Sequence, residues 1–215
     1  MPAARYLAIA CIGYLLGAIP SGLVVARLSR GIDIRRTGSG RTGATNVMRA
    51  AGRPAGLATL LLDVSKASAA VLLAWVILPR DSAQTVAALG AVAGHIWPVF
   101  IGFRGGRGVA AYLGCLLVLC WPVGVGAGAV MLAVAGRTRY MSLGSIAGMA
   151  ASFIAMLALM VTGARAPVVL ESPVPAWHVL FSGLAGGIIL LQHRDNVRRL
   201  LTGTERRLGR GPGPD

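Results

Sequence analysis

Charged residues are scarce in this chain, and acidic ones are the scarcest: seven Asp and Glu stand against 21 Lys and Arg in 215 residues. Charged residues make up 13% of the sequence, whereas a soluble domain carries about 25%. Hydrophobic residues reach 55%, and the mean hydropathy is +0.71. This apolar surplus exceeds what one globular core can hold. It excludes an ordinary soluble domain and predicts a polytopic, all-α membrane protein.

Other scarcities exclude further classes. The three cysteines, Cys11, Cys115 and Cys120, are scattered within apolar segments without metal-ligand spacing, so neither a disulfide framework nor a zinc site is expected. The basic loops lack interleaved aromatic residues, which argues against a nucleic-acid partner. The lipid bilayer is the partner that this composition predicts.

Apolar segments long enough to cross a hydrocarbon core of roughly 30 Å recur along the chain. The stretch 109–136 is divided by Trp121 and Pro122, and two short spans with a tight turn fit it better than one kinked helix. The sequence therefore predicts seven spans, from the segments 5–29, 55–79, 83–101, 109–136 (counted twice), 143–163 and 176–192.

The basic residues predict the orientation of these spans. Most of the 21 Lys and Arg fall in the loops after spans one, three and five and in the C-terminal tail, whereas Arg5, Arg80 and Arg165 fall on the other side. By the positive-inside rule the crowded side is cytoplasmic, so the N-terminus is expected outside and the C-terminus inside. We expect one membrane domain over 1–208 and a disordered tail at 209–215.

The first candidate site is "DIRRTGSGRTGATNVMR", residues 33–49. Gly38, Gly40 and Gly43 match G-x-G-x-x-G, but no preceding strand supports a dinucleotide fold. Glycines that take positive φ, with Ser39, Thr45 and Asn46 nearby, can instead turn backbone N–H groups inward around an anion. Arg49 follows on the same loop. The alternative is a flexible loop whose arginines serve only topology.

The second candidate site is "GHIWPVFIGFRGGRGVAAYLG", residues 94–114. No Gly-Lys-Ser/Thr ends the glycine run, so it is not a P-loop. Gly105 and Gly106 still offer close backbone approach, and Arg104 and Arg107 place cations at the mouth of a helix, where anions are favoured. His95 lies nearby. A lone histidine on an apolar face is more often structural, but its neighbours favour a functional role.

Two weaker signals follow. In "RTRYMSLGS", Ser142 is typical of a capping serine at a helix start. In "QHRDNVRRLLTGTE", His193 and Asn196 share a face if the last span continues as a helix. Asp63 and Lys66 lie within the second span at i, i+3, where structural pairing is favoured over function.

These polar segments are predicted to emerge at one membrane face, which suggests a site for a phosphorylated molecule at the lipid boundary. A transporter for a small phosphorylated anion is the alternative, but it requires polar groups through the bilayer centre. A noncatalytic lipid-binding scaffold is a third possibility, which leaves His95 and Ser39 unexplained.

The chain resembles the bacterial membrane-embedded acyl-phosphate:glycerol-3-phosphate acyltransferase family. The resemblance runs from about Gly13 to Glu205, on "GSGRTGATNVMR", "GHIWPVFIGFRGGRGVA" and "HRDNVRRLLTGTE", with "YMSLGS" and "DVSK" also fitting. It implies seven membrane helices in the bacterial inner membrane and an active site at the cytoplasmic surface. It also implies acyl transfer from acyl phosphate to the 1-hydroxyl of glycerol 3-phosphate, giving lysophosphatidic acid and inorganic phosphate in phospholipid synthesis.

The resemblance also implies roles for the candidate residues. Its catalytic residues would be His95, in the reaction centre, with Ser39 and Asn46. The glycine loop around Ser39 would bind acyl phosphate, Arg49 and Arg107 would hold phosphate charge, and Ser142, His193 and Asn196 would position glycerol 3-phosphate. The implied substrate-binding set is Gly38, Gly40, Gly43, Thr45, Arg49, Arg104, Gly105, Gly106, Arg107, Ser142, His193 and Asn196.

The sequence departs from the family pattern in two places. Arg41 and Thr42 replace the usual Asn-Pro, and Arg104 and Arg107 replace two lysines, which keeps the charge but exchanges a compact ammonium for a planar fork. Acyl phosphate is an activated mixed anhydride, so we expect no cofactor, metal or protein nucleophile. The expected partners are the two substrates and the soluble enzyme that makes acyl phosphate.

Overall fold

The computed structural model describes residues 2–164 and 173–209, and within these ranges the regular elements are helices, with no β-strand. Its contacts divide them into two compact units, one ending at Cys115 and the other beginning at Leu116. The expected tail at 209–215, apart from Gly209, and most of the connection at 164–175, including Arg165, lie outside the described residues.

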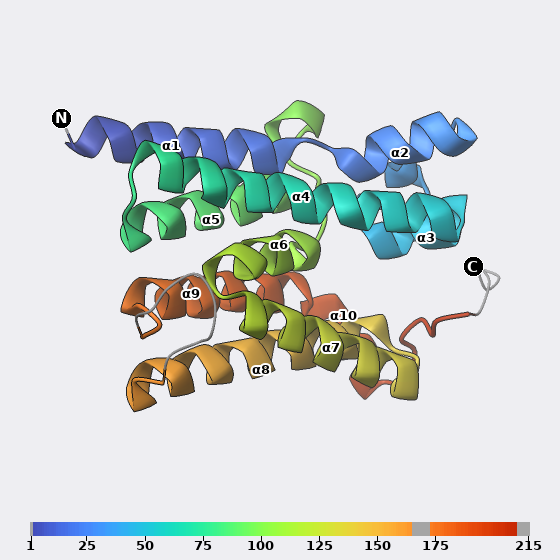
Figure 1. Ribbon diagram of the computed structural model, residues 1–215. Helices are drawn as coiled ribbons and strands as arrows, with labels where there is room; N and C mark the ends of the chain where they lie inside the picture. Colours follow the sequence, from blue (N-terminus) through green and yellow to red (C-terminus); the bar gives the residue numbers. More distant parts are fainter. Residues whose placement is uncertain (1, 165–172, 210–215) are drawn as a thin grey trace. The chain divides into compact units, whose positions relative to one another are not determined.

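The first unit is built on three helices, α1 (Pro2–Ala18), α4 (Arg53–Ile77) and α5 (Asp81–Ile96), which pack side by side (Figure 1). Gly13 and Gly17 of α1 meet the backbone of Ala87 and Ala91 of α5 so closely that a Cβ would overlap it. Two glycines four apart on one helix thus let the two helix backbones approach closely.

The segment 5–29 is not one straight helix. α1 ends at Ala18, and α2 (Ser21–Arg30) begins after Pro20. The proline ring disfavours helical backbone at Ile19, which accounts for the break. In the same way, the expected span 83–101 stops at Ile96, before Pro98, and a short 3-10 turn, η2 (Val99–Ile101), follows.

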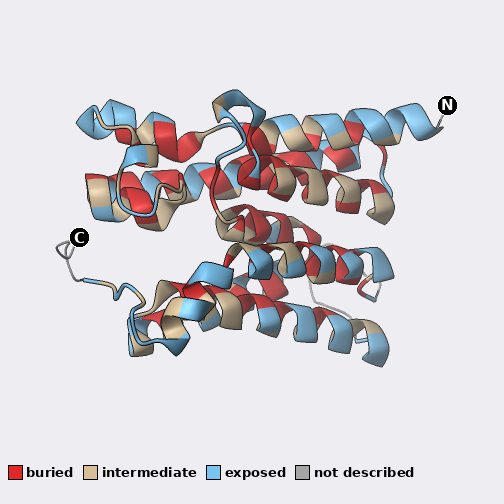
Figure 2. Cartoon of the chain, turned by 180° about the vertical axis from the view of Figure 1, so that it is seen from behind, coloured by how far each residue is buried: buried red, intermediate tan, exposed pale blue. Residues whose placement is uncertain are grey.

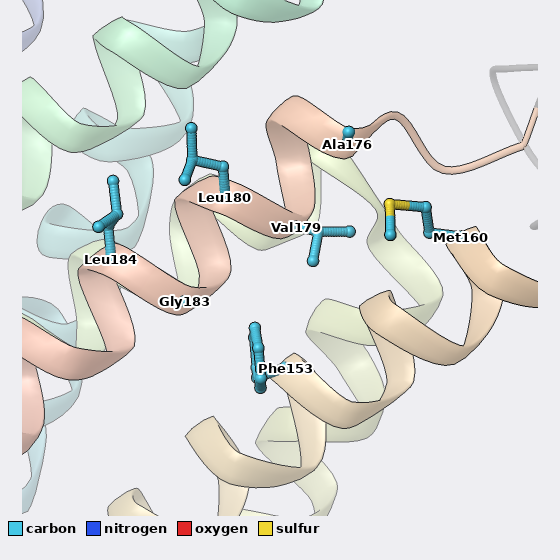
Figure 3. A pocket seen from close by; sticks show the side chains of 7 residues that line it. All are labelled: Phe153, Met160, Ala176, Val179, Leu180, Gly183 and Leu184. Carbon is cyan, nitrogen blue, oxygen red and sulfur yellow. The ribbon is translucent and has the colours of Figure 1, made fainter.

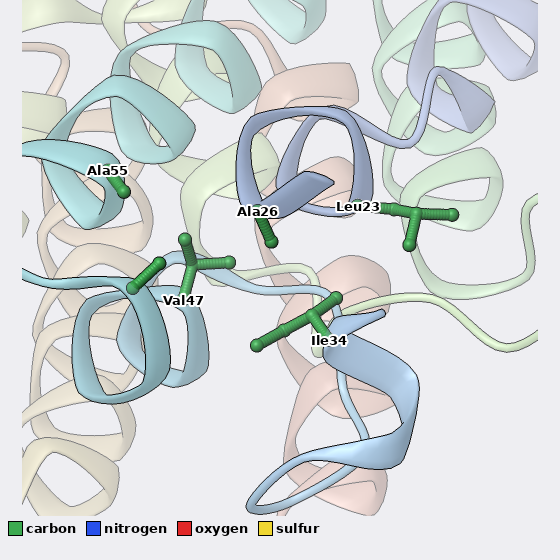
Figure 4. Close-up of a cluster of buried hydrophobic side chains, with 6 residues drawn as sticks. Leu23, Ala26, Ile34, Val47 and Ala55 are labelled. Carbon is green, nitrogen blue, oxygen red and sulfur yellow. The ribbon is translucent and has the colours of Figure 1, made fainter. Parts of the chain in front are cut away.

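The polar stretch expected to be a loop at 33–49 contains two short elements, η1 (Ile34–Arg36) and α3 (Ala44–Ala51). They pack with α2 and the start of α4 around a small apolar cluster, shown in Figure 4. The cluster consists of Leu23, Ala26, Ile34, Val47, Ala51 and Ala55. The glycine loop at 37–43 is therefore fixed at both ends by buried side chains.

α6 (Val109–Leu119) begins in the first unit, where Gly114 lies against Val64 of α4. The second unit holds α7 (Trp121–Thr138), α8 (Met141–Thr162), α9 (Ala176–Gln192) and α10 (Arg194–Leu201). The predicted division of 109–136 at Trp121 and Pro122 is confirmed. α7 and α8 form a hairpin in which Gly144 and Gly148 lie against the α7 backbone.

Large apolar side chains face outward as well as inward. Leu61, Val76, Ile154 and Leu191 are all exposed, and Figure 2 shows buried and exposed stripes along the helices. Within the described residues, four helices are long and apolar enough to cross a membrane, or five if the bent pair α9–α10 is one span. A helical membrane protein is confirmed; seven spans and their orientation remain predictions.

Candidate active site

The centre of the first unit holds a buried group of charges. Asp63 of α4 is 1% exposed, and its Oδ1 lies 2.8 Å from Nζ of Lys66. The same oxygen lies 3.5 Å from Nδ1 of His95, at the end of α5. The predicted pairing of Asp63 with Lys66 is therefore confirmed, but the contact with His95 was not expected. It joins residues that are 32 positions apart in the sequence, which is why spacing alone could not reveal it.

Lys66 also connects this group to the break in the first span. Its Nζ donates to the carbonyl of Ile19, at 2.6 Å. That carbonyl lies at the break between α1 and α2 and also accepts from the N–H of Ser21, at 2.9 Å. One lysine thus joins a buried carboxylate of α4 to the break in the first span.

The glycine run at 102–108 folds back onto the end of α5. The N–H groups of Gly105 and Gly106 donate to the carbonyls of Ile96 and His95, each at 3.1 Å. A Cβ on Gly106 would overlap Nε2 of the His95 ring and lie 3.0 Å from its Cδ2 and Cε1. These two N–H groups are therefore used by the protein, and the glycines serve the close approach to His95. Binding of phosphate by their backbone stays a prediction.

Two cations flank this glycine turn. Arg107 follows Gly106 directly and is half-buried, whereas Arg104 is exposed. Within residues 2–164 and 173–209 no carboxylate lies within ion-pair distance of Arg104. Arg35, in contrast, is held by Asp33 through two side-chain hydrogen bonds of 3.0 and 2.7 Å. Those bonds lower the pKa of Asp33 below its ordinary value. Arg35 thus belongs to a structural pair.

Asn46 organises the loop that carries Ser39. Its Nδ2 donates to the carbonyls of Arg41 and Thr37, at 2.9 and 3.0 Å, and lies 3.4 Å from that of Ile34. Its Oδ1 accepts from the N–H of Ser39 at 3.2 Å. The amide is thus taken up by loop backbone, which makes Asn46 a positioning residue in this structure. A direct catalytic role for it stays a prediction.

The glycines of this loop differ from one another. Gly38 and Gly40 take the expected positive φ, at 62° and 66°. Gly43 does not: it precedes α3 with φ of −74°. The N–H of Gly40 donates to the carbonyl of Thr37, and that of Ser39 donates to Oδ1 of Asn46. Neither N–H is therefore directed at an anion, as the sequence had suggested for this loop. Thr45, in the first turn of α3, and Arg49, one turn later, stay candidates for that role.

Residues from both candidate segments of the first unit, 33–49 and 94–114, lie near α4. Gly22 of α2 lies so close to the carbonyl of Thr42 that a Cβ would overlap it, and that Cβ would also lie 3.2 Å from the methyl of Thr59. Thr59 is one helical turn from Asp63, which contacts His95. Thr42, at the end of the loop around Ser39, and His95 therefore both lie near one face of α4.

In the second unit, Glu205 accepts hydrogen bonds from two of the candidate residues, Ser142 and Asn196. Its Oε1 accepts from Ser142 at 2.8 Å and from Nδ2 of Asn196 at 2.7 Å, and its Oε2 accepts from Arg199 at 2.8 Å. Burial raises the pKa of Glu205, but these three hydrogen bonds outweigh it, and the pKa lies below its ordinary value. Ser142 is not the helix cap that its position suggested, because Tyr140 occupies that place.

His193 lies at a bend rather than within a continuous helix. The axes of α9 and α10 differ by 58°, so the condition under which His193 and Asn196 were expected to share a face, a last span that continues as one helix, is not met. Nδ1 of His193 donates to the carbonyl of Ile189 at 2.8 Å, which assigns the ring proton to Nδ1. The ring is buried one turn before Asn196.

The second unit also has an apolar groove of about 360 Å³ between α8 and α9 (Figure 3). Its lining is Phe153, Met160, Ala176, Val179, Leu180, Gly183 and Leu184. These residues lie toward the end of α8 and the start of α9, away from Ser142 and Asn196. The groove carries no polar side chain, so it is not the candidate site. No cluster of three metal-ligating side chains occurs within residues 2–164 and 173–209.

Comparison with known proteins gives the family of this chain. The family model for glycerol-3-phosphate acyltransferase matches residues 7–203. This chain belongs to that family. It is 41% identical over 217 residues to glycerol-3-phosphate acyltransferase 3 of Dehalococcoides mccartyi, covering 95% of this chain and 96% of the relative. It is 43% identical over 198 residues to the glycerol-3-phosphate acyltransferase of a Synechococcus strain, covering 92% of each.

Solved structures give the same family. The acyltransferase is similar to PlsY (YgiH), an integral membrane glycerol 3-phosphate acyltransferase, crystallised in a glycerol 3-phosphate form. The TM-score is 0.83 at 37% identity, covering 95% of this chain and 96% of that one. The resemblance inferred from the motifs is confirmed: the chain is a membrane acyltransferase. This removes the grounds for the transporter and scaffold alternatives.

Proposed function

We propose that this acyltransferase moves a fatty acyl group from acyl phosphate to the 1-hydroxyl of glycerol 3-phosphate. The products are lysophosphatidic acid and inorganic phosphate, in phospholipid synthesis. Relatives with more than 40% identity carry the name glycerol-3-phosphate acyltransferase. Related PlsY structures were solved in glycerol 3-phosphate and lysophosphatidic acid forms. These names support the acceptor and the lipid product.

The observation that carries the proposal is the setting of His95. Its ring lies between the buried carboxylate of Asp63 and the glycine turn that leads into Arg107. A histidine oriented in this way can accept the proton of an attacking hydroxyl. A cation beside it can hold the phosphate of an acyl phosphate, which is both the activating group and the leaving group.

The reaction needs orientation more than chemical activation. The 1-hydroxyl oxygen bonds to the acyl carbon, the bond from that carbon to the bridging oxygen breaks, and phosphate leaves with that oxygen. The hydroxyl proton passes either to Nε2 of His95 or to the departing phosphate itself. Holding two reactants in line contributes up to roughly 7–11 kcal/mol in favourable cases. Under this proposal Ser39, Arg49, Arg104 and Arg107 hold acyl phosphate.

Glycerol 3-phosphate is assigned to Ser142, His193 and Asn196 of the second unit. Glu205 fixes the side chains of Ser142 and Asn196 through one shared oxygen. His193 carries its proton on Nδ1 and is buried one turn before Asn196, and under this proposal its ring borders the bound glycerol 3-phosphate. In this role Ser142, His193 and Asn196 set the position of glycerol 3-phosphate, the acyl acceptor, and not its reactivity.

The loop between α5 and the two arginines also suits an amphiphilic acyl donor. The exposed residues Trp97, Phe100 and Phe103 precede Arg104. The loop is held by backbone hydrogen bonds from Phe103 to Pro98, at 2.9 Å, and from Gly105 to Ile96. An apolar surface beside a cation suits a fatty acyl chain that ends in a phosphate.

The proposal includes a topology of seven spans within one domain over 1–208, with the N-terminus outside and the C-terminus in the cytoplasm. Under this topology, the site faces the cytoplasm of a bacterial inner membrane, where a soluble enzyme supplies acyl phosphate. The basic loops support this orientation by the positive-inside rule.

The test is acyl transfer by the purified protein. Acyl phosphate and labelled glycerol 3-phosphate are supplied without acyl-CoA or acyl carrier protein. Labelled lysophosphatidic acid is expected, together with an equal amount of phosphate. If the label enters lipid only when acyl-CoA or acyl carrier protein is the donor, the proposed donor is wrong.

A further inference from the structure

The segment between the end of α5 and Arg104, residues 97–103, is exposed and apolar, and we call it the aromatic turn. Four of its side chains are 41–60% exposed: Trp97, Val99, Phe100 and Phe103. Exposed apolar side chains on α4 or α8 are expected, because those helices are long enough to face lipid across a membrane. The aromatic turn lies beyond the end of its helix, so its apolar surface needs a separate explanation.

The aromatic turn is firmly attached to the first unit. Ile101 packs against the apolar cluster of α2, η1 and α3, and Pro98 is buried. The hydroxyl of Tyr14 on α1 donates to the carbonyl of Trp97 at 2.7 Å, and the N–H of Phe103 donates to that of Pro98 at 2.9 Å. The exposed side chains are therefore held outward in a defined position.

The backbone at Phe103 is strained in a way that keeps its ring exposed. Phe103 has a φ of 60°, in the left-handed region that bulky residues rarely adopt, and Gly102 before it has a φ of 70°. Strain of this kind persists only where the surrounding structure imposes it, and it gathers at functional segments. Here it accompanies a reversal of the chain that leaves a phenylalanine and Arg104 exposed side by side.

The aromatic turn lies at the level where α1 ends. Gly94 of α5 packs against α1 so closely that a Cβ would overlap the carbonyl of Tyr14 and the N–H of Ala18, the last residue of α1. In Figure 1 the turn projects from the side of the first unit, close to the break between α1 and α2. Figure 2 shows it largely exposed. Aromatic and basic side chains at the end of a span are typical of the layer between hydrocarbon and water.

We propose that the aromatic turn docks into this interfacial layer of the bilayer, with Trp97, Phe100 and Phe103 among the upper acyl chains and Arg104 at the level of the lipid phosphates. In water these apolar side chains would stay hydrated, and in the hydrocarbon core irregular backbone would face lipid. The interface avoids both costs, and its anionic headgroups match the cation. The inference does not rest on the proposed acyl donor, because it concerns bilayer lipids and is measured without substrate.

Tryptophan fluorescence tests the docking. The chain has four tryptophans, so Trp75→Phe, Trp121→Phe and Trp177→Phe together leave Trp97 as the single reporter. The protein is reconstituted into vesicles of phosphatidylcholine and phosphatidylglycerol, three to one, whose chains carry bromine either near the headgroup or near the chain end. Iodide is added from the water. If the triple replacement does not fold, the difference between wild type and Trp97→Phe gives the same signal.

The matched control is a protein that keeps only Trp75, which is 49% exposed on α4 and should be quenched by brominated lipid in the same vesicles. Emission of Trp97 is expected to fall about twofold or more with bromine near the headgroup, less with bromine near the chain end, and little with iodide. Quenching by iodide alone would place the turn in water. Stronger quenching from the chain ends would place it in the hydrocarbon core, and quenching by neither would mean that protein covers it. Each of these three results overturns the inference.

The double variant Phe100→Asn/Phe103→Asn tests whether the two rings anchor the turn. Asparagine enters the left-handed region more readily than phenylalanine, so the backbone of the turn is kept. Both rings are exposed, so the thermal midpoint in detergent should stay close to that of wild type. Quenching of Trp97 by brominated lipid should fall by about half, and quenching by iodide should rise. Lipid quenching equal to that of the unaltered turn would contradict the docking.

Discussion

Substitution of Gly106 by alanine tests the placement of His95 most sharply. An added Cβ would overlap Nε2 of the ring and lie 3.0 Å from Cδ2 and Cε1, whereas ordinary contact begins at 3.4 Å. The φ angle of Gly106 is not in the left-handed region, so alanine strains no backbone there. The ring must therefore move, by about 1 Å, and a misplacement of that size can cost about 10²-fold in rate.

The assay is steady-state acyl transfer by Gly106→Ala beside Gly126→Ala, whose Cβ would meet nothing within 4 Å. We expect kcat to fall by about 100-fold in the first variant and to stay within twofold in the second. KM for glycerol 3-phosphate should change little in either, since the glycine turn is not assigned to that substrate. Wild-type kcat in Gly106→Ala, alongside an inactive His95→Ala, would refute the reasoning.

Three further predictions concern other parts of the site. Arg107→Ala should lose about 1.5–3 kcal/mol of binding to acyl phosphate, roughly 10- to 150-fold, with partial recovery in Arg107→Lys, as measured by kcat/KM; unaltered binding contradicts the clamp. Asn46→Ala removes the hydrogen bonds that hold the Ser39 loop. It should cost about 2–3 kcal/mol in unfolding experiments and raise KM for acyl phosphate; wild-type stability would argue against the positioning role. Because hydrogen bonding lowers the pKa of Glu205, its stabilising effect is present above the ordinary value of about 4.3 and lost as pH falls through the lowered folded value. The thermal midpoint of wild type should thus exceed that of Glu205→Gln at pH 7, and the gap should close in acid; a gap independent of pH would contradict this.

Helices and their type could be predicted from the sequence because apolar length is a strong, local signal. The division at Trp121 and Pro122 and the bounds of the last span, 176–192, could be read from it. The break at Pro20 was missed, although the proline explains it. α3 was also missed, since its eight residues look like loop until Val47 and Ala51 are seen buried against α2.

The residue types of the candidate site could be predicted from the sequence, but the contacts between those residues could not. Cations, glycines and His95 could be singled out because they interrupt apolar sequence. The contact of His95 with Asp63, and the three donors gathered by Glu205, join segments separated by 32 and up to 63 positions. A glycine predicted to approach phosphate can also permit close packing within the protein, as Gly106 does against His95. Only tertiary structure distinguishes those two uses of glycine.

The central claim is that two bound reactants exchange an acyl group directly, oriented by His95 and its neighbours. Radiolabelled acyl phosphate mixed with excess protein and quenched within one turnover tests it. The account predicts no label on protein without glycerol 3-phosphate, and label in lysophosphatidic acid, matched by phosphate, when it is added. Acyl label on the protein that is chased into lipid by glycerol 3-phosphate would contradict it.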